Sequence, residues 1–251
     1  MSGGFAAYPS LNGAVVFITG GAMGIGAALV RAFHGQGARV AFVDVAAVAG
    51  EALAADLPGA WFRQVDVTDV AALEGAIAAA AAAMGPVTVL VNNVANDTRH
   101  TPEDTDAAAW RAHLAVNLDP TFLAARAVRA GMAAAGGGSI INFSSITAFL
   151  GPADLPAYVA AKGAVNALTR SLARAWGGEA IRVNAIAPGW VETERQRALW
   201  LSPDAEADWN REAALHRLVQ PQEVARLALF LAADDSAAIT GQTLLIDAGR
   251  I

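Results

Sequence analysis

Two side chains with clear chemical potential, Tyr158 and Lys162, stand four residues apart in the stretch PAYVAAKGAVNALTR (residues 156–170). Lys162 is the single lysine among 17 lysines and arginines, and Tyr158 is one of 2 tyrosines. A chain that otherwise uses arginine keeps an ammonium here, which indicates a task that a planar guanidinium cannot perform. Residues four apart share one face of a helix, where an ammonium favours the ionised form of a phenol. The pair therefore predicts that Lys162 lowers the pKa of the Tyr158 phenol, which is ordinarily about 10.

A glycine-rich turn, FITGGAMGIGAAL (residues 17–29), joins a predicted strand to a predicted helix. Glycine has no Cβ, so the backbone and the helix N-terminus can approach a pyrophosphate closely. Gly20, Gly24 and Gly26 follow the spacing Gly-x-x-x-Gly-x-Gly, which differs from the Gly-x-Gly-x-x-Gly of many dinucleotide sites. Turns use glycine for other reasons too, so the cluster needs support from the residues around it.

That support comes from Asp44, which ends the next predicted strand. A carboxylate at this place can accept hydrogen bonds from the ribose hydroxyls of adenosine, although a helix cap or turn residue is the alternative. A 2'-phosphate held about 4 Å from it would be disfavoured by roughly 4 kcal/mol at an effective dielectric constant of about 20. No arginine follows Asp44, and Met23 rather than a basic residue occupies the glycine turn. The sequence therefore predicts NAD as the cofactor in preference to NADP.

The elements that must position these residues alternate along the chain. Apolar runs rich in β-branched residues begin near residues 14, 39, 87, 139, 181 and 243, and segments with helical spacing separate them. This alternation predicts βαβ units and an α/β fold with a mainly parallel, doubly wound sheet. The longest irregular region is expected at 188–215, and a substrate lid is expected around 189–216, beyond a strand end.

Composition narrows the possible functions. The 251 residues suit one domain, 1–251, and the net charge of −6 without a basic cluster argues against nucleic acid and membrane surfaces as partners. Cysteine is absent from the sequence, which excludes thiolate chemistry. His34, His113 and His216 lack metal-ligand company, so no metal site is expected. The N-terminal residues 1–13 do not resemble a signal peptide, and a cytoplasmic location is expected.

The ordered set of motifs resembles the short-chain dehydrogenase/reductase family, from about residue 11 to 250. The motifs are Thr19-Gly20-x-x-x-Gly24-x-Gly26, Asp66-Val67, Asn92-Asn93, Asn117, Ser145, Tyr158-x-x-x-Lys162 and Pro188-Gly189. The resemblance implies one Rossmann-type domain, doubly wound, with a seven-stranded parallel sheet, helices on both faces, and usually a homotetramer. In one departure, the chain has NNVA (residues 92–95) where the family usually has Asn-Asn-Ala-Gly, and the added methyl groups narrow the floor beside the cofactor.

The resemblance also implies catalytic roles. Tyr158 is the acid/base, and Lys162 holds the nicotinamide ribose and favours the phenolate. Ser145 hydrogen-bonds the reacting oxygen, with Ser144 as the alternative, although the spacing to Tyr158 favours Ser145. Asn117 holds a water in the proton relay, with a kink or capping amide in a helix as the alternative.

For the cofactor, the resemblance implies an adenine contact at Asp66 and Val67, support of the sheet by Asn92, and a pocket for the nicotinamide amide around residues 188–193. The cofactor-binding residues predicted for NAD are Gly20, Met23, Gly24, Ile25, Gly26, Asp44, Asp66, Val67, Asn93, Ala95, Tyr158, Lys162, Pro188, Gly189, Val191 and Thr193.

The substrate is suggested by the stretch NNVANDTRH (residues 92–100), which resembles the same segment in bacterial aldose 1-dehydrogenases, enzymes that oxidise sugars to lactones. A sugar site requires convergent polar groups and one stacking ring. The alternative for Arg99 and His100 is that they are solvated loop residues. The alternative for Trp190 is that it only packs against the lid. The predicted substrate contacts are Asn96, Arg99, His100, Ser145, Thr147, Tyr158 and Trp190, with Glu192, Glu194, Arg195 and Gln196 near the mouth of the pocket.

The leading hypothesis is an NAD-dependent aldose 1-dehydrogenase that takes a hydride from C1 of a sugar, a small-molecule substrate. The same catalytic residues also fit a polyol or secondary-alcohol dehydrogenase and a 3-oxoacyl reductase. A regulator that senses NAD without turnover is the hypothesis from another class, and the complete set of catalytic residues argues against it.

Overall fold

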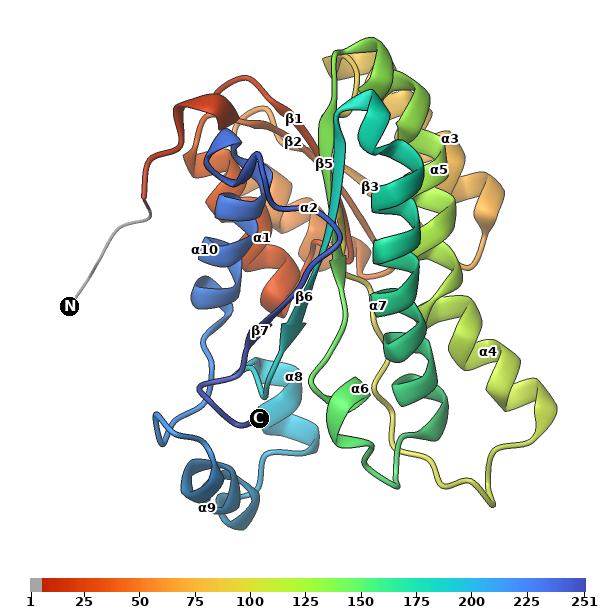
Figure 1. Cartoon of the computed structure of the whole chain (residues 1–251), viewed down its shortest axis with the longest axis vertical. Coiled ribbons are helices and arrows are strands. Elements are labelled where there is room, and N and C mark those ends of the chain that lie inside the picture. Colours follow the sequence, from red (N-terminus) through yellow and green to blue (C-terminus); the bar gives the residue numbers. More distant parts are fainter. Residues whose placement is uncertain (1–5) are drawn as a thin grey trace.

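The computed structural model describes residues 6–251 and builds them around one parallel sheet of seven strands (Figure 1). The strand order is β3-β2-β1-β4-β5-β6-β7, and every neighbouring pair is parallel. The predicted doubly wound α/β fold with seven parallel strands is confirmed. Residues 1–5, part of the N-terminal stretch discussed above, lie outside the described residues.

Six strands start within two residues of their predicted positions. The strands are β1 (Val15–Thr19), β2 (Arg39–Asp44), β3 (Trp61–Gln64), β4 (Val89–Asn92), β5 (Gly138–Phe143), β6 (Ile181–Pro188) and β7 (Thr243–Ile246). The hydrophobic pattern missed β3, an edge strand in which Trp61 and Phe62 are only half-buried and Arg63 and Gln64 are exposed. A strand so little buried does not produce a continuous apolar run.

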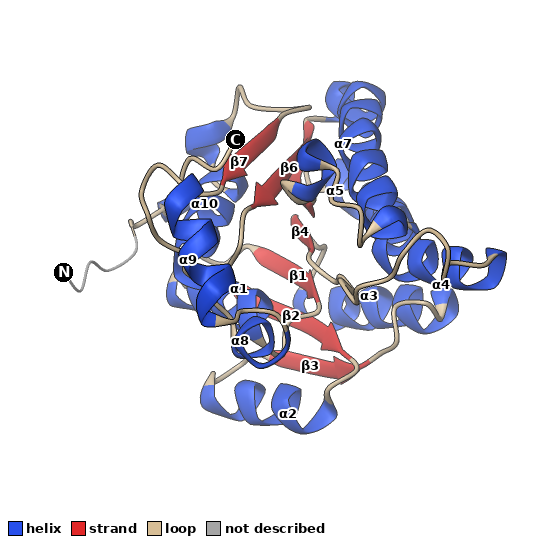
Figure 2. Ribbon diagram, turned by 90° about the horizontal axis from the view of Figure 1, so that it is seen from below, coloured by secondary structure: helices blue, strands red, loops and turns tan. Residues whose placement is uncertain are grey.

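Helices cover both faces of the sheet (Figure 2). On one side, α1 and α10 pack through side chains such as Phe33 and Leu229; on the other, α3, α5 and α7 pack through side chains such as Leu73 and Leu172. The helices are α1 (Gly24–Gly35), α2 (Ala47–Asp56), α3 (Val70–Met84), α4 (Ala107–Asn117), α5 (Asp119–Ala134), α6 (Thr147–Leu150), α7 (Pro156–Trp176), α8 (Glu194–Leu199), α9 (Pro203–Glu212) and α10 (Pro221–Ala232).

The strand order reverses between β1 and β4, which lie side by side although β2 and β3 separate them in the chain. In an open α/β sheet, such a reversal leaves a crevice outside the carboxyl ends of the strands. β1, β2, β4, β5 and β6 end at Thr19, Asp44, Asn92, Phe143 and Pro188. The predicted site residues follow these strand ends, so the topology brings them to one edge of the sheet.

The expected irregular region 188–215 was wrong, because it contains α8 and α9. Each helix starts at a capping side chain: Thr193 Oγ1 accepts from Gln196 N, and Ser202 Oγ accepts from Ala205 N. A hydroxyl residue at the N-cap is a readable helix signal, and Pro203 at the first position of α9 strengthens it. The long segment without helix or strand is instead 93–106, between β4 and α4.

The described residues contain neither a membrane-spanning helix nor a cluster of metal-binding side chains. Across residues 6–251, no helix combines the length and the apolar character needed to cross a bilayer. In the same residues, the side chains of His, Asp and Glu form no group of three or more that could hold a metal ion.

The backbone conformation and close packing of the glycine turn explain why it contains glycine at these positions. Gly20 and Gly24 adopt φ values of 67° and 54°, a region that side chains disfavour. A Cβ on Gly26 would lie 1.8 Å from the carbonyl oxygen of Gly20. The turn and the start of α1 can therefore approach each other only without a side chain at position 26.

We expect Gly26→Ala to destabilise the protein by about 1–3 kcal/mol, because the backbone must shift to relieve the clash. Gly75→Ala is the matched control, since Gly75 lies in α3 and a Cβ there meets no atom within 4 Å. This control should stabilise the protein by about 0.4–1 kcal/mol. Thermal unfolding of both variants measures the difference, and equal melting temperatures would contradict the clash.

Candidate active site

A cavity of about 1290 Å³ opens at the carboxyl edge of the sheet, between the glycine turn, the strand ends, the start of α7 and the segment after β6. Pockets for single small ligands are typically about 300–1,000 Å³, so this one has room for a dinucleotide together with a small substrate. The predicted residues that line it are Gly20, Met23, Gly24, Ile25, Gly26, Asp44, Val67, Asn93, Ala95, Arg99, Ser145, Thr147, Tyr158, Lys162, Pro188, Gly189, Trp190, Val191 and Thr193, together with Glu192, Glu194, Arg195 and Gln196 near the mouth.

Tyr158 and Lys162 lie on one face of α7, buried at the back of this cavity. Lys162 is 2% exposed, and its Nζ donates to the carbonyl of Phe143 at the end of β5 (2.7 Å). The same nitrogen lies 5.5 Å from the centroid of the Tyr158 ring. Burial lowers the pKa of Lys162 to about 8, and the nearby Asp97 charge acts weakly in the other direction. The ammonium is thus anchored, and burial makes its proton easier to remove than that of a lysine in water.

The expected lowering of the Tyr158 pKa is wrong for the protein's own groups. Burial raises the pKa of this phenol, and the negative charge of Asp97 raises it further. A hydrogen bond with Ser145 and the charges of Arg99 and Arg195 act in the opposite direction without overcoming burial. The sequence reveals the neighbouring cation but not the removal of the phenolate from water, which is the largest effect on this pKa.

The structure separates the two serines between which the sequence left a choice. Ser144 Oγ donates to the carbonyl of Lys162 (3.1 Å) and so fastens β5 to α7. Ser145 Oγ accepts from the backbone N–H of Thr147 (3.2 Å) and from its hydroxyl (2.9 Å). With its acceptor positions occupied, Ser145 can direct its own proton into the cavity, next to Tyr158. This arrangement favours Ser145 as the serine of the site.

Asn93 and Thr193 support the glycine turn. Asn93 Nδ2 donates to the carbonyl of Gly20 (2.9 Å), so the loop after β4 holds the turn after β1. From the other side, a Cβ on Gly24 would lie 3.3 Å from Cγ2 of Thr193. The segment after β6 therefore packs directly on the turn.

Asp44 binds backbone N–H groups of the glycine turn and of the segment before α2, and it also faces the cavity. Its Oδ2 accepts from Ala22 N in the glycine turn (2.9 Å), and its Oδ1 accepts from Ala46 N ahead of α2 (3.0 Å). The carboxylate still lines the cavity. Because each carboxylate oxygen can accept more than one hydrogen bond, ribose hydroxyls can bind without breaking the turn.

Asp66, Asn96 and Asn117, which the sequence placed in the site, do not line the cavity. Asp66 is exposed, and its Oδ1 accepts from the backbone and the hydroxyl of Thr68. Asn117 ends α4, where its side chain exchanges hydrogen bonds with the backbone of Asn96 (2.8 and 3.1 Å). Asn117 therefore lies at the break between α4 and α5 and fixes the loop after β4, and its predicted part in a proton relay stays a prediction.

His100 does not line the cavity either. Its Nε2 accepts from Ala157 N (3.1 Å), one of the N–H groups that the first turn of α7 leaves without a helical partner. Its Nδ1 therefore carries the proton and donates to the carbonyl of Thr98 (2.8 Å). The ring stacks on His113 with the centroids 4.0 Å apart, and burial lowers the pKa of His113. His100 is thus a cap for the helix that carries Tyr158.

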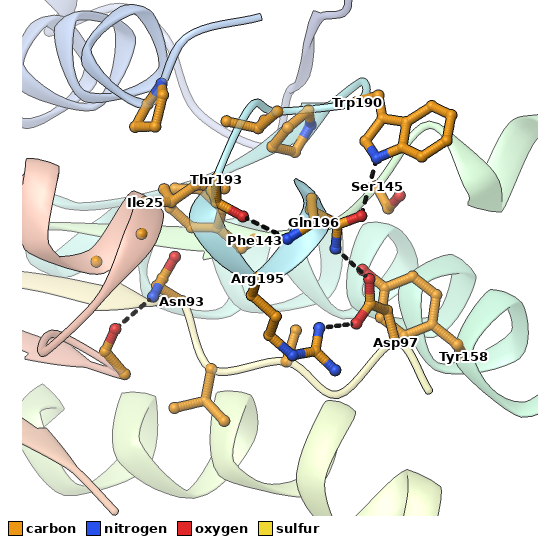
Figure 3. A pocket seen from close by; sticks show the side chains of 18 of the residues that line it. Ile25, Asn93, Asp97, Phe143, Ser145, Tyr158, Trp190, Thr193, Arg195 and Gln196 are labelled. Atoms are coloured by element: carbon orange, nitrogen blue, oxygen red, sulfur yellow. Dashed lines mark hydrogen bonds and ion pairs between the residues drawn. The ribbon is translucent and has the colours of Figure 1, made fainter. Parts of the chain in front are cut away.

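The sequence interpretation missed Asp97, which faces the residues near the mouth (Figure 3). Its Oδ2 accepts from Gln196 Nε2 (2.6 Å), and its Oδ1 pairs with Arg195. Gln196 Oε1 in turn accepts from Trp190 Nε1 (2.8 Å). The signal was present, because Asp97 lies inside the 92–100 stretch that was already assigned to the substrate.

These features define a dinucleotide-binding oxidoreductase of the Rossmann type, and comparisons with known proteins agree. Residues 20–250 match the family model described as enoyl-(acyl carrier protein) reductase. The chain is 44% identical to a "Probable galactose dehydrogenase" of Rhizobium meliloti, over 96% of both chains. It is also 44% identical to the D-xylose 1-dehydrogenase of Caulobacter vibrioides, over 97% of this chain and 98% of the relative.

A solved structure is similar as well: a mutant of a Serratia marcescens short-chain dehydrogenase/reductase superposes with a TM-score of 0.89 and 31% identity, over 96% of this chain and 99% of the other. The chain belongs to the short-chain dehydrogenase/reductase family, whose dehydrogenases use nicotinamide cofactors.

We expect His100→Ala to destabilise the protein by about 1 kcal/mol, because α7 loses its capping acceptor. In a chain of this size, that loss lowers the melting temperature by about 2–4 °C. Arg111→Ala is the control on the exposed face of α4 and should change stability by less than about 0.5 kcal/mol. If the two variants unfold at the same temperature, His100 does not cap the helix.

Proposed function

We propose that the protein is an NAD-dependent aldose 1-dehydrogenase, which oxidises the C1 hydroxyl of a sugar to the lactone. Two relatives with 44% identity over almost the whole chain are named for galactose and xylose, and this supports an aldose as the substrate. The observation that carries the proposal is that Tyr158 and Ser145 share one cavity with Asp44 and the glycine turn. A hydroxyl bound at Tyr158 therefore has space beside it for a dinucleotide.

In the proposed reaction, Tyr158 Oη removes the proton of the C1 hydroxyl. Ser145 donates a hydrogen bond to the reacting oxygen and keeps its proton, since its acceptor positions are taken by Thr147. The glycine turn and Asp44 would hold NAD in the same cavity, where it would supply the acceptor for the hydride of C1. Lys162, anchored on Phe143, directs its remaining N–H donors to the ribose hydroxyls and keeps a positive charge near Tyr158.

Asp44 would select NAD. Its carboxylate can accept from the adenosine ribose hydroxyls, and a phosphate at the 2' position would face its negative charge. The neighbouring exposed side chains, Met23 and Val45, offer no positive charge to compensate. The proposal also places the segment 189–216 over the substrate as a lid.

The proposal includes a homotetramer in the cytoplasm, where the nicotinamide cofactor is available. Exposed apolar side chains on three elements support association between copies: Trp110 on α4, Phe122 on α5 and Leu245 on the edge strand β7.

Tyr158→Phe tests the reaction. It keeps the ring and removes the hydroxyl, and we expect a loss of about 100- to 10,000-fold in turnover with D-galactose or D-xylose, measured as NADH formation. Since the base must be deprotonated and burial raises the pKa of Tyr158, the wild-type oxidation rate should rise with pH through the neutral range into the alkaline range.

An unchanged far-ultraviolet circular dichroism spectrum and melting temperature of Tyr158→Phe are the control for correct folding. Near wild-type turnover of this variant would remove the assignment of the base. Oxidation of polyols but of no aldose would favour the polyol hypothesis, and NAD binding without any turnover would favour the regulator.

Asp44→Asn tests the choice of cofactor. Removal of the charge should reduce the preference for NAD over NADP, as the ratio of the two kcat/KM values, by about 10- to 100-fold, or roughly 1.4–2.7 kcal/mol. Asp56→Asn is the control with the same change of charge, at an exposed position at the end of α2. An unchanged ratio in Asp44→Asn, or an initial preference for NADP, would contradict the proposal.

A further inference from the structure

Asp97 is a carboxylate on the wall of the cavity near the reacting groups. Its side chain is 19% exposed and lies in the irregular segment after β4. Its charge acts on both Tyr158 and Lys162, so it lies near the place where a bound substrate would react. The mechanism proposed above gives this carboxylate no task.

The partners of Asp97 leave part of its capacity free. A carboxylate offers about four acceptor positions; here Arg195 takes one on Oδ1 and Gln196 takes one on Oδ2. The side-chain amide of Gln196 donates one of its two protons to Asp97, while its oxygen accepts from Trp190. One open acceptor on each oxygen of Asp97, with an amide proton beside them, suits two neighbouring hydroxyl groups.

Trp190 completes the surface with an apolar face. Its ring is half-buried, packs edge-on against Trp209 with the centroids 6.1 Å apart, and lines the cavity. Figure 3 shows that the indole N–H points to Gln196, which fixes the ring orientation. A carbohydrate presents polar edges and apolar C–H faces, and this wall offers a match for both.

We propose that Asp97 determines substrate specificity by accepting hydrogen bonds from two adjacent hydroxyls of a neutral sugar, hydroxyls that are not themselves oxidised, with Gln196 and Trp190 completing that subsite. The inference rests on the proposed sugar oxidation and deepens it. The hydrogen bond from Gln196 then holds the carboxylate in place, and the contact with Arg195 balances its charge near Tyr158.

The competing explanation is that Asp97 only fastens the segment 190–196 to the loop after β4. In that case, removal of the Asp97 carboxylate would change the kinetic constants for every sugar, and for the cofactor, to the same extent. A subsite gives a different result, because a hydrogen bond disappears equally when the residue or the hydroxyl is removed.

The experiment measures kcat and KM of the wild type and of Asp97→Asn with D-galactose and with its 2-, 3-, 4- and 6-deoxy analogues. Hydrogen bonds to a charged group predict a loss of about 10- to 100-fold in kcat/KM for D-galactose, mainly through KM. For an analogue that lacks one of the two bound hydroxyls, the loss on substitution should shrink to about 3- to 10-fold, because the other hydrogen bond remains, while the KM for NAD stays the same.

Arg195→Gln is the matched variant, since it breaks the same ion pair from the other side. It should keep the wild-type pattern across the deoxy sugars. A loss in Asp97→Asn that is equal for all five sugars, or is reproduced by Arg195→Gln, would overturn the subsite. If Asp97→Asn does not fold, a wild type that is indifferent to every deoxy analogue overturns it as well. Failure of the proposed function has a separate signature: the wild type then oxidises no aldose at all.

Discussion

The buried ammonium of Lys162 is the constraint on which the site depends. A charge so deep in the protein needs a partner, and the carbonyl of Phe143 provides one at the end of β5. To meet that carbonyl, α7 must lie against β5, and Ser144 fastens the same two elements by binding the carbonyl of Lys162. The position of Tyr158 on the same helix face follows from this packing.

The protonation of Tyr158 and Lys162 depends on opposing effects of burial and of neighbouring charges. Burial keeps the Tyr158 phenol protonated and brings the Lys162 pKa down to about 8, so both groups resist charge. Asp97 opposes ionisation of Tyr158, while Arg99 and Arg195 favour it. A positive charge bound next to the phenol would lower the pKa of Tyr158. This fits a base that acts only when its cationic cofactor is present.

Much of this arrangement could be predicted from the sequence, because β-branched runs and glycine turns are local signals. The strand β3 was not predicted, because an exposed edge strand has no continuous apolar run. The helices α8 and α9 were not predicted either, although the caps Thr193 and Ser202 are signals for their first residues. Side-chain direction was harder. His100 and Asn117 have residue types that suit a polar pocket, yet both bind backbone groups instead. Which way a polar side chain turns depends on contacts between segments far apart in the chain, and the order of residues does not reveal those contacts.

The concentration of basic character in arginine has a practical consequence. Reagents that acylate amines find no lysine side chain on the protein's surface, because the one lysine is 2% exposed and lies inside the cavity. Apart from the α-amino group, covalent labelling of amines would therefore report on access to the cavity alone. The same property limits enzymatic marking of lysines, such as acetylation, to the single residue on which turnover is proposed to depend.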